Sequence, residues 1–266
     1  MVLRGSGQRG DLARLEVLRL ADGAELLVGW ESRTREPVLR SDILPREELA
    51  LVEALRRHLP EGATVLAMPE LSRRLARLTA LDLPLASAAG VAGLRLPAPW
   101  LDAAEDVRRI EARWQGAAAQ EAGPLWQAFA AALTAAPAEG AAALAGLAGG
   151  EGTHLVLHLR DGFDLGLAAG DRLAMAVRDL PAVGAHDGSR QVRAWMHEHG
   201  HAAFALQARA GGGVRAYFLM DPEDRGLLIT SLLPFSSARI GQVPGAVVVF
   251  QSGGYWVYRL GDAAGR

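Results

Sequence analysis

The sequence lacks two residue types altogether: none of its 266 residues is cysteine, and all 28 basic residues are arginine. The lack of cysteine excludes covalent c-type haem attachment, iron–sulfur clusters, cysteine-type zinc sites and a thiol nucleophile. The lack of lysine excludes Schiff-base chemistry, attachment of pyridoxal phosphate and the lysine of a phosphate-binding loop. We predict a protein without a cofactor.

Long apolar runs and an excess of charge of one sign are also absent. No segment reaches the ~18 to 20 apolar residues of a membrane span, and the N-terminal residues lack the apolar run of a signal peptide. We expect contact with a membrane only through an anchor that this sequence does not contain. The 28 basic and 30 acidic residues give a net charge of −2, which is too little asymmetry to suggest nucleic acid as a partner.

The hydrophobic pattern predicts the fold class. A composition of 50% hydrophobic and 22% charged residues is that of an ordinary globular protein. Period-two and helical patterns alternate along the chain, which predicts an α/β fold with a mixed sheet flanked by helices. Strands are expected over residues 15–20, 25–31, 64–68, 154–160, 173–177, 202–208, 214–220, 246–250 and 255–260. Helices are expected over residues 45–59, from Pro69, and over 100–114, 124–135, 141–147, 189–199 and 221–233.

A glycine-rich segment, residues 149–152, is the best candidate for a boundary between subdomains. We predict a disordered tail over residues 1–12, an N-terminal α/β subdomain over 13–150, and a C-terminal α/β subdomain over 151–266 that is rich in β-hairpins. The tail contains a G-x-G-x-x-G pattern at residues 5–10. Binding of a dinucleotide would need a strand before this pattern and a helix after it, and the sequence predicts neither.

The stretch from His154 to His201 holds every histidine except His58, and it is where we expect a site. Arg160-Asp161 and Arg178-Asp179 each follow a predicted apolar strand, and His186 lies in the predicted loop after the second strand. Ligands in open α/β sheets bind outside the carboxyl ends of the strands, so these side chains could line one polar cleft. The alternative is that the Arg and Asp residues only cap strands or pair within the connecting loops.

The cluster from His197 to His201 suggests a metal site, because imidazole nitrogens bind zinc, copper and nickel. Its spacing argues against one. His199 belongs to the apolar stripe of the predicted helix and should pack in the core, whereas Gly200 should end the helix before His201. We predict no metal site, with His197 and His201 as the weak candidates for ligands.

Several ordered segments resemble one family. They are HLVLHLRDGFDLGLAAGDRLAMAVRDLPAVGAHDGSRQVRAWM at residues 154–196, VRAYFLMD at 214–221, SLLPF at 231–235 and GGYWVYRL at 253–260. Together they resemble the HaoB family, the accessory proteins encoded with hydroxylamine oxidoreductase. The resemblance implies a periplasmic protein that supports hydroxylamine oxidation without carrying haem. It also implies hydroxylamine oxidoreductase, or another multihaem protein, as the partner.

Two functional hypotheses follow. The first is a periplasmic accessory protein of hydroxylamine and ammonia oxidation that acts as a binding or assembly partner and is not an enzyme. The second is a ligand-binding or transferase-associated α/β domain that uses the polar cleft at the strand ends. The sequence does not bring a nucleophile, a base and an oxyanion donor together as a set, which favours the first hypothesis.

Overall fold

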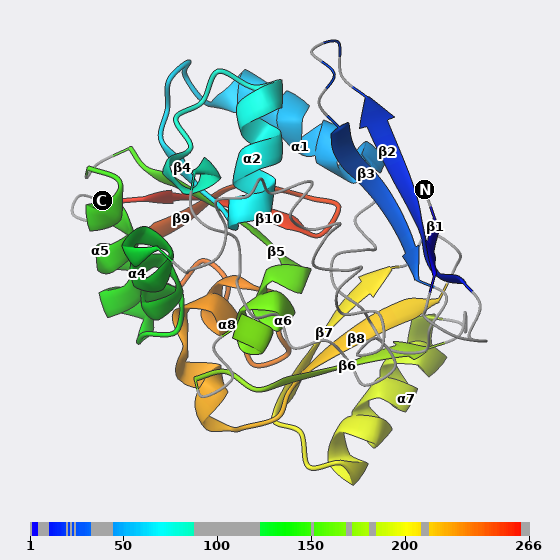
Figure 1. Ribbon diagram of the computed structural model, residues 1–266. Helices are drawn as coiled ribbons and strands as arrows, with labels where there is room; N and C mark the ends of the chain where they lie inside the picture. Colours follow the sequence, from blue (N-terminus) through cyan, green and yellow to red (C-terminus); the bar gives the residue numbers. More distant parts are fainter. Residues whose placement is uncertain are drawn as a thin grey trace.

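The computed structural model describes residues 2–4, 11–19, 21, 23, 25–32, 45–87, 123–149, 152–168, 172–180, 185–208 and 213–261 (Figure 1). These residues form the predicted mixed α/β fold. The strands are β1 (Val2–Arg4), β2 (Asp11–Arg19), β3 (Glu25–Ser32), β4 (Val65–Leu66), β5 (His154–His158), β6 (Met175–Leu180), β7 (Ala203–Ala208), β8 (Val214–Leu219), β9 (Ala246–Ser252) and β10 (Tyr255–Leu260). The helices are α1 (Pro45–His58), α2 (Pro69–Leu78), α4 (Pro124–Leu133), α5 (Pro137–Leu147), α6 (Leu159–Ala168), α7 (Ala185–Glu198) and α8 (Leu228–Leu232), with 3-10 helices η1 (Pro84–Ala86) and η3 (Glu223–Gly226).

A four-stranded mixed sheet with the order β4-β5-β10-β9 forms the centre of the fold. β4 and β5 run parallel, whereas β10 is antiparallel to both of its neighbours. Every residue of β5 is buried, because helices cover both faces of the sheet. Val156 packs in the core of α1 and α2, whereas Leu155 and Leu157 pack in the core of α4, α5 and α8.

A second, antiparallel sheet has the order β6-β8-β7. Side chains on a strand alternate between faces, and β8 shows this directly. Tyr217 and Leu219 belong to the large core that includes the central sheet, whereas Ala216 and Phe218 pack with Val192 of α7. Figure 1 shows α7 along the outer side of this sheet. The second sheet is therefore a layer between α7 and the large core.

The predicted hairpins are confirmed. β2 pairs antiparallel with β3, β7 pairs antiparallel with β8, and β9 pairs antiparallel with β10. However, Val2–Arg4 forms β1 and pairs with β2, although the sequence predicted a disordered tail there. That prediction is wrong for these residues, because pairing with β2 provides partners for their backbone groups. The division into two subdomains stays a prediction.

Other elements differ from their predicted bounds. The strand predicted over residues 154–160 ends at His158, where α6 begins, because the alternation of leucines continues past the true strand end. The helix predicted over 221–233 is split into η3 and α8, since Leu227 between them has extended backbone. The helix predicted over 100–114 lies outside the described residues. No described helix is long and apolar enough to span a membrane.

Candidate functional site

A group of buried polar side chains lies where β5 meets α6. His158 is the last residue of β5 and precedes the first residue of α6. Nδ1 of its imidazole accepts a hydrogen bond from the backbone N–H of Arg160 at 3.1 Å, and the Asp161 carboxyl accepts one from the backbone N–H of His158 at 2.8 Å. This reciprocal pair resembles a capping box, although the imidazole accepts from the second residue of the helix and not from the third. It pairs two backbone N–H groups at a buried helix start.

The His158 ring also connects the two sheets. Its centroid lies 4.8 Å from that of Tyr255 in β10, in an edge-on arrangement. Its Nε2 lies 3.3 Å from the side-chain amide of Gln207 in β7, and this amide lies 2.9 Å from the hydroxyl of Tyr217 in β8. A line of polar contacts therefore runs from the central sheet to the antiparallel sheet.

On the other side of the central sheet, an ion pair joins the first two helices. Nε of Arg74 in α2 donates to a carboxylate oxygen of Glu48 in α1 at 2.7 Å. Arg74 also interacts electrostatically with Tyr255 and Asp161. The ion pair and the helix cap therefore form one group, which we call the buried polar cluster: Glu48, Arg74, His158, Arg160, Asp161, Gln207, Tyr217 and Tyr255.

Burial determines the protonation state of His158. Burial, together with the positive charges of Arg160 and Arg74, lowers the pKa of this imidazole to about 3. The ring is therefore neutral at neutral pH, and since Nδ1 accepts from the Arg160 amide, the ring proton is on Nε2. The backbone of Gly253 is a hydrogen-bond partner of this ring, whereas the amide oxygen of Gln207 accepts from the Tyr217 hydroxyl.

Asp161 has the opposite shift. Burial raises the pKa of its carboxyl to about 8, and the nearby charge of Asp164 acts in the same direction. The hydrogen bond from the His158 backbone and the charges of Arg74 and Arg160 oppose this rise without cancelling it. Asp161 is therefore a neutral acid at neutral pH. Burial likewise raises the pKa of the Tyr217 hydroxyl to about 12.

These shifts predict how stability depends on pH. The folded chain holds the Asp161 proton up to about pH 8, whereas the unfolded chain releases it near the model value of 3.8. The stability from this proton is complete below pH 3.8 and is lost as pH rises through 8. His158 contributes stability that is complete above pH 6.5 and is lost as pH falls towards 3. Of these two groups, only Asp161 therefore changes the free energy of unfolding as pH rises above 6.5.

Asp161→Asn should remove this alkaline loss, because asparagine resembles the protonated acid and cannot ionise. Between about pH 6.5 and pH 8 we expect the wild type to lose on the order of 1–2 kcal/mol of unfolding free energy that the variant retains, since one proton contributes up to about 1.4 kcal/mol per pH unit. Urea unfolding at the two pH values measures this difference. Asp82→Asn is the control, because Asp82 is exposed, and it should follow the wild type. Equal losses for Asp161→Asn and the wild type would contradict the assigned protonation state.

The sequence-predicted site residues fall into two groups. Arg160 and Asp161 lie in the first turn of α6, where they are 2% and 7% exposed and belong to the buried polar cluster. Arg178 and Asp179 lie within β6, which extends past the predicted strand end at residue 177. Arg160 and Asp161 are helical, whereas Arg178 and Asp179 belong to the strand β6 itself. The prediction that both pairs directly follow strands is therefore wrong.

The β6 pair has structural partners of its own. The carboxylate of Asp179 accepts two hydrogen bonds from the guanidinium of Arg215 at 2.6 and 2.8 Å. The guanidinium of Arg178 lies 5.0 Å from the ring of Trp195 in α7. His186 was predicted in a loop, but its backbone lies in the first turn of α7, which begins at Ala185 rather than after Ser189. A cleft shared by all five residues stays a prediction.

The later histidines lie at the end of α7. Gly200 has φ 68° and ends the helix, as predicted. His199 is exposed, so the prediction that it packs in the core is wrong. Its ring stacks on Trp195 at 4.0 Å between centroids, and its Nδ1 bonds to the Trp195 carbonyl at 3.0 Å. His199 therefore contacts Trp195 and not the core residues that we expected. The described residues contain no group of three or more side chains, His197 and His201 included, that could hold a metal ion.

Comparison with known proteins supports the family resemblance. A family model described as HaoA-associated protein HaoB matches residues 2–260. The chain belongs to the HaoB family. The match extends from β1 to β10, so the whole buried polar cluster lies inside the matched region. No curated protein and no solved structure gives a significant match to this HaoB-family chain.

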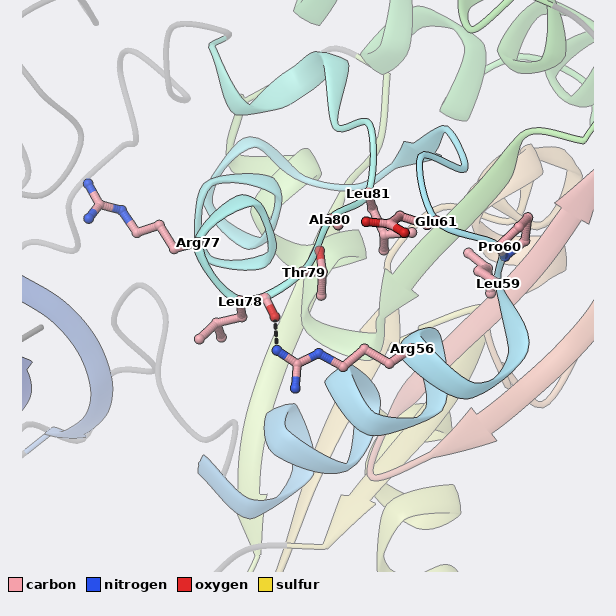
Figure 2. Close-up of a pocket in the computed structure, with 9 residues that line it drawn as sticks. All are labelled: Arg56, Leu59, Pro60, Glu61, Arg77, Leu78, Thr79, Ala80 and Leu81. Atoms are coloured by element: carbon pink, nitrogen blue, oxygen red, sulfur yellow. Dashed lines mark hydrogen bonds between the residues drawn. The ribbon is translucent and has the colours of Figure 1, made fainter.

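The surface of this HaoB-family chain has a pocket of about 480 Å³ where α1 and α2 end (Figure 2). It is lined by Arg56, Leu59, Pro60, Glu61, Arg77, Leu78, Thr79, Ala80 and Leu81. Arg56 donates a hydrogen bond to the carbonyl of Leu78. Figure 2 shows the side chain of Arg77 pointing away from Arg56 and the other lining residues. Cations at helix C-termini complement the helix dipole. Arg56 and Arg77 lie in the last turns of α1 and α2, where a positive charge is favourable.

Sequence reasoning missed most of the buried polar cluster. Glu48, Arg74, Gln207, Tyr217 and Tyr255 come from five different elements, and no local pattern links them. The one available signal was local: a histidine followed three residues later by an aspartate, which matches a capping box with an unusual N-cap residue. The cluster contains a neutral acid and a neutral imidazole. Both are buried, and both take part in the hydrogen bonds at the start of α6.

Proposed function

We propose that this HaoB-family chain is a periplasmic accessory protein of hydroxylamine oxidation that binds hydroxylamine oxidoreductase, the protein named HaoA in the family description. One observation carries the proposal: the family model, described by its association with HaoA, matches residues 2–260. The absence of cysteine supports a role beside a haem protein, because c-type haem is attached through cysteine.

The character of the polar residues supports binding rather than catalysis. Several hydrogen-bonding groups of the buried polar cluster have intramolecular partners, as has the Asp179–Arg215 pair, whereas Nη2 of Arg160 and the hydroxyl of Tyr255 have no hydrogen-bond partner among the described residues. Buried groups that are engaged in this way determine one folded geometry. Such a protein acts through its shape and surface, as expected of an assembly or binding partner.

We expect this chain to form a complex with hydroxylamine oxidoreductase. The purified proteins should co-elute from a gel-filtration column, and the dissociation constant should be micromolar or tighter by calorimetry, because an interface of specific size typically gives at least such affinity. An unrelated multihaem cytochrome c is the control and should not shift the elution. Independent elution at tens of micromolar, with no heat of binding, would refute the proposed partner.

Location needs its own test. Fractionation of cells that produce the native gene product should release the protein with the periplasmic contents, or with the membrane if an anchor is present. Recovery with the cytoplasmic fraction alone would refute the periplasmic location, whatever the result for the partner.

A further inference from the structure

The outer strand β9 leaves one edge of the central sheet open among the described residues. It is the last strand in the order β4-β5-β10-β9. Its seven residues, AVVVFQS, include no charge and no proline. Val247 and Val249 in this strand are 48% and 42% exposed. An open, apolar edge of this kind is a template for pairing with another strand, because its outward backbone N–H and C=O groups have no partner within the sheet.

The other outer strands of the central sheet and of the antiparallel sheet are protected. Asp82 lies beside β4, and its backbone carbonyl accepts a hydrogen bond from this strand at 2.8 Å. Ser236 lies beside β7 and donates its backbone N–H to the carbonyl of Phe204 at 2.7 Å. β6 carries two exposed charged residues, Arg178 and Asp179. Within the described part of the chain, β9 alone among these four outer strands has neither a covering segment nor a charge.

The hydrogen-bond pattern shows which backbone groups of β9 point outward. Leu260 of β10 donates its backbone N–H to Thr153 on the β5 side at 2.7 Å. Backbone groups alternate between the two neighbours of a strand, so Tyr258 also faces β5, and its partner Val248 in β9 points its N–H and C=O away from β10. The same alternation directs the backbone of Gln251 outward. An extended strand is the partner that can bond to both positions.

We propose that β9 pairs antiparallel with β9 of a second copy of this chain, so that the four strands of each copy form one continuous sheet. A two-fold axis between residues 249 and 250 sets Val248 of each copy opposite Gln251 of the other, so both outward positions are paired at once. Like charges on opposite strands are destabilising, and β9 brings none to a copy of itself. Because Asp82 covers the far edge of each central sheet, the pairing stops at two copies. This proposal does not depend on the proposed partner.

The mass of the full chain in solution tests the pairing. By light scattering at about 100 μM we expect twice the 28.1 kDa of one chain, and we expect dissociation on dilution, because an interface built on one strand is small and typically gives only micromolar affinity. A wild-type chain that keeps 28.1 kDa at the higher concentration would overturn the proposal.

Substitutions in β9 test whether this edge is the interface. Val249→Lys places like charges near the two-fold axis, and it should raise the dissociation constant of the dimer on the order of tenfold or more. Gln251→Pro removes one outward N–H without adding a charge and should weaken the dimer too. Met220→Lys is the matched control, because Met220 is 48% exposed but follows β8 of the other sheet, and it should leave the dimer unchanged. A dimer that resists both changes in β9 would overturn the proposal.

Exchange of backbone amides provides a readout on the wild type, so the proposal stays open to refutation even if a variant does not fold. The N–H groups of Val248 and Gln251 should exchange at least about tenfold faster at about 1 μM than at about 100 μM. Fast exchange at both concentrations would overturn the proposal. Slow exchange at both in a chain of 28.1 kDa would also overturn it, because another segment of the same chain would then cover the edge. Protection that arises only when hydroxylamine oxidoreductase is added would assign the edge to that protein and would exclude the second copy.

Discussion

Gly140→Ala is expected to lower the free energy of unfolding by about 3 kcal/mol or more, because the new methyl group has no room. Gly140 lies in the first turn of α5, where this helix crosses α4 and α8. A Cβ atom there would lie 2.3 Å from the backbone oxygen of Ala132 and 2.9 Å from a methyl carbon of Leu228. A backbone oxygen cannot rotate away, so α4 and α5 would have to separate and the core around Leu228 would open.

Gly146→Ala is the matched control on the same helix. A Cβ at Gly146 would meet nothing within 4 Å, and this position is exposed. Alanine has the higher helix propensity, so this variant should gain about 0.5–1 kcal/mol. Urea unfolding of both variants compares the same chemical change in two environments. A similar effect in both positions would contradict the packing of α5 against α4.

Gly254→Ala is expected to cost about 3 kcal/mol of unfolding free energy, through backbone strain and a steric clash together. Gly254 lies in the turn between β9 and β10 with φ 84°, a conformation that residues with a side chain rarely adopt. Its Cβ would lie 2.7 Å from Nε2 of His158. The imidazole cannot move without losing its hydrogen bond from the Arg160 amide, so the clash would reach the cap of α6.

Gly62→Ala separates strain from steric clash, because Gly62 has φ 75° but nothing within 4 Å of a Cβ. Gly62→Ala should lower the free energy of unfolding by only about 1–2 kcal/mol, because alanine is unfavourable in a left-handed backbone conformation. The difference between the two alanine variants in chemical unfolding then reports the contact with His158. If Gly254→Ala lowers the free energy of unfolding no more than Gly62→Ala does, the turn does not approach the imidazole of His158 as closely as described.

The junction of β5 and α6 shows what a local sequence pattern can and cannot predict. The hydrophobic alternation correctly placed a buried strand at His154. It could not show that Arg160 and Asp161 start a helix, because Leu159 continues the strand pattern while its backbone is already helical. The helix start depends on the imidazole of His158, and histidine is an uncommon N-cap residue.

The sequence by itself determined the α/β class, the three hairpins, helices α1, α2, α4 and α5, and the family, because these depend on periodicity, turn residues and ordered segments within short stretches. The tertiary structure alone decided which polar groups meet. Glu48 and Arg74 are brought to Asp161, and Gln207 and Tyr217 to His158, by the packing of two sheets and their helices. The protonation state of Asp161 followed from that packing, because burial raises the pKa of its carboxyl where the fold removes water from it.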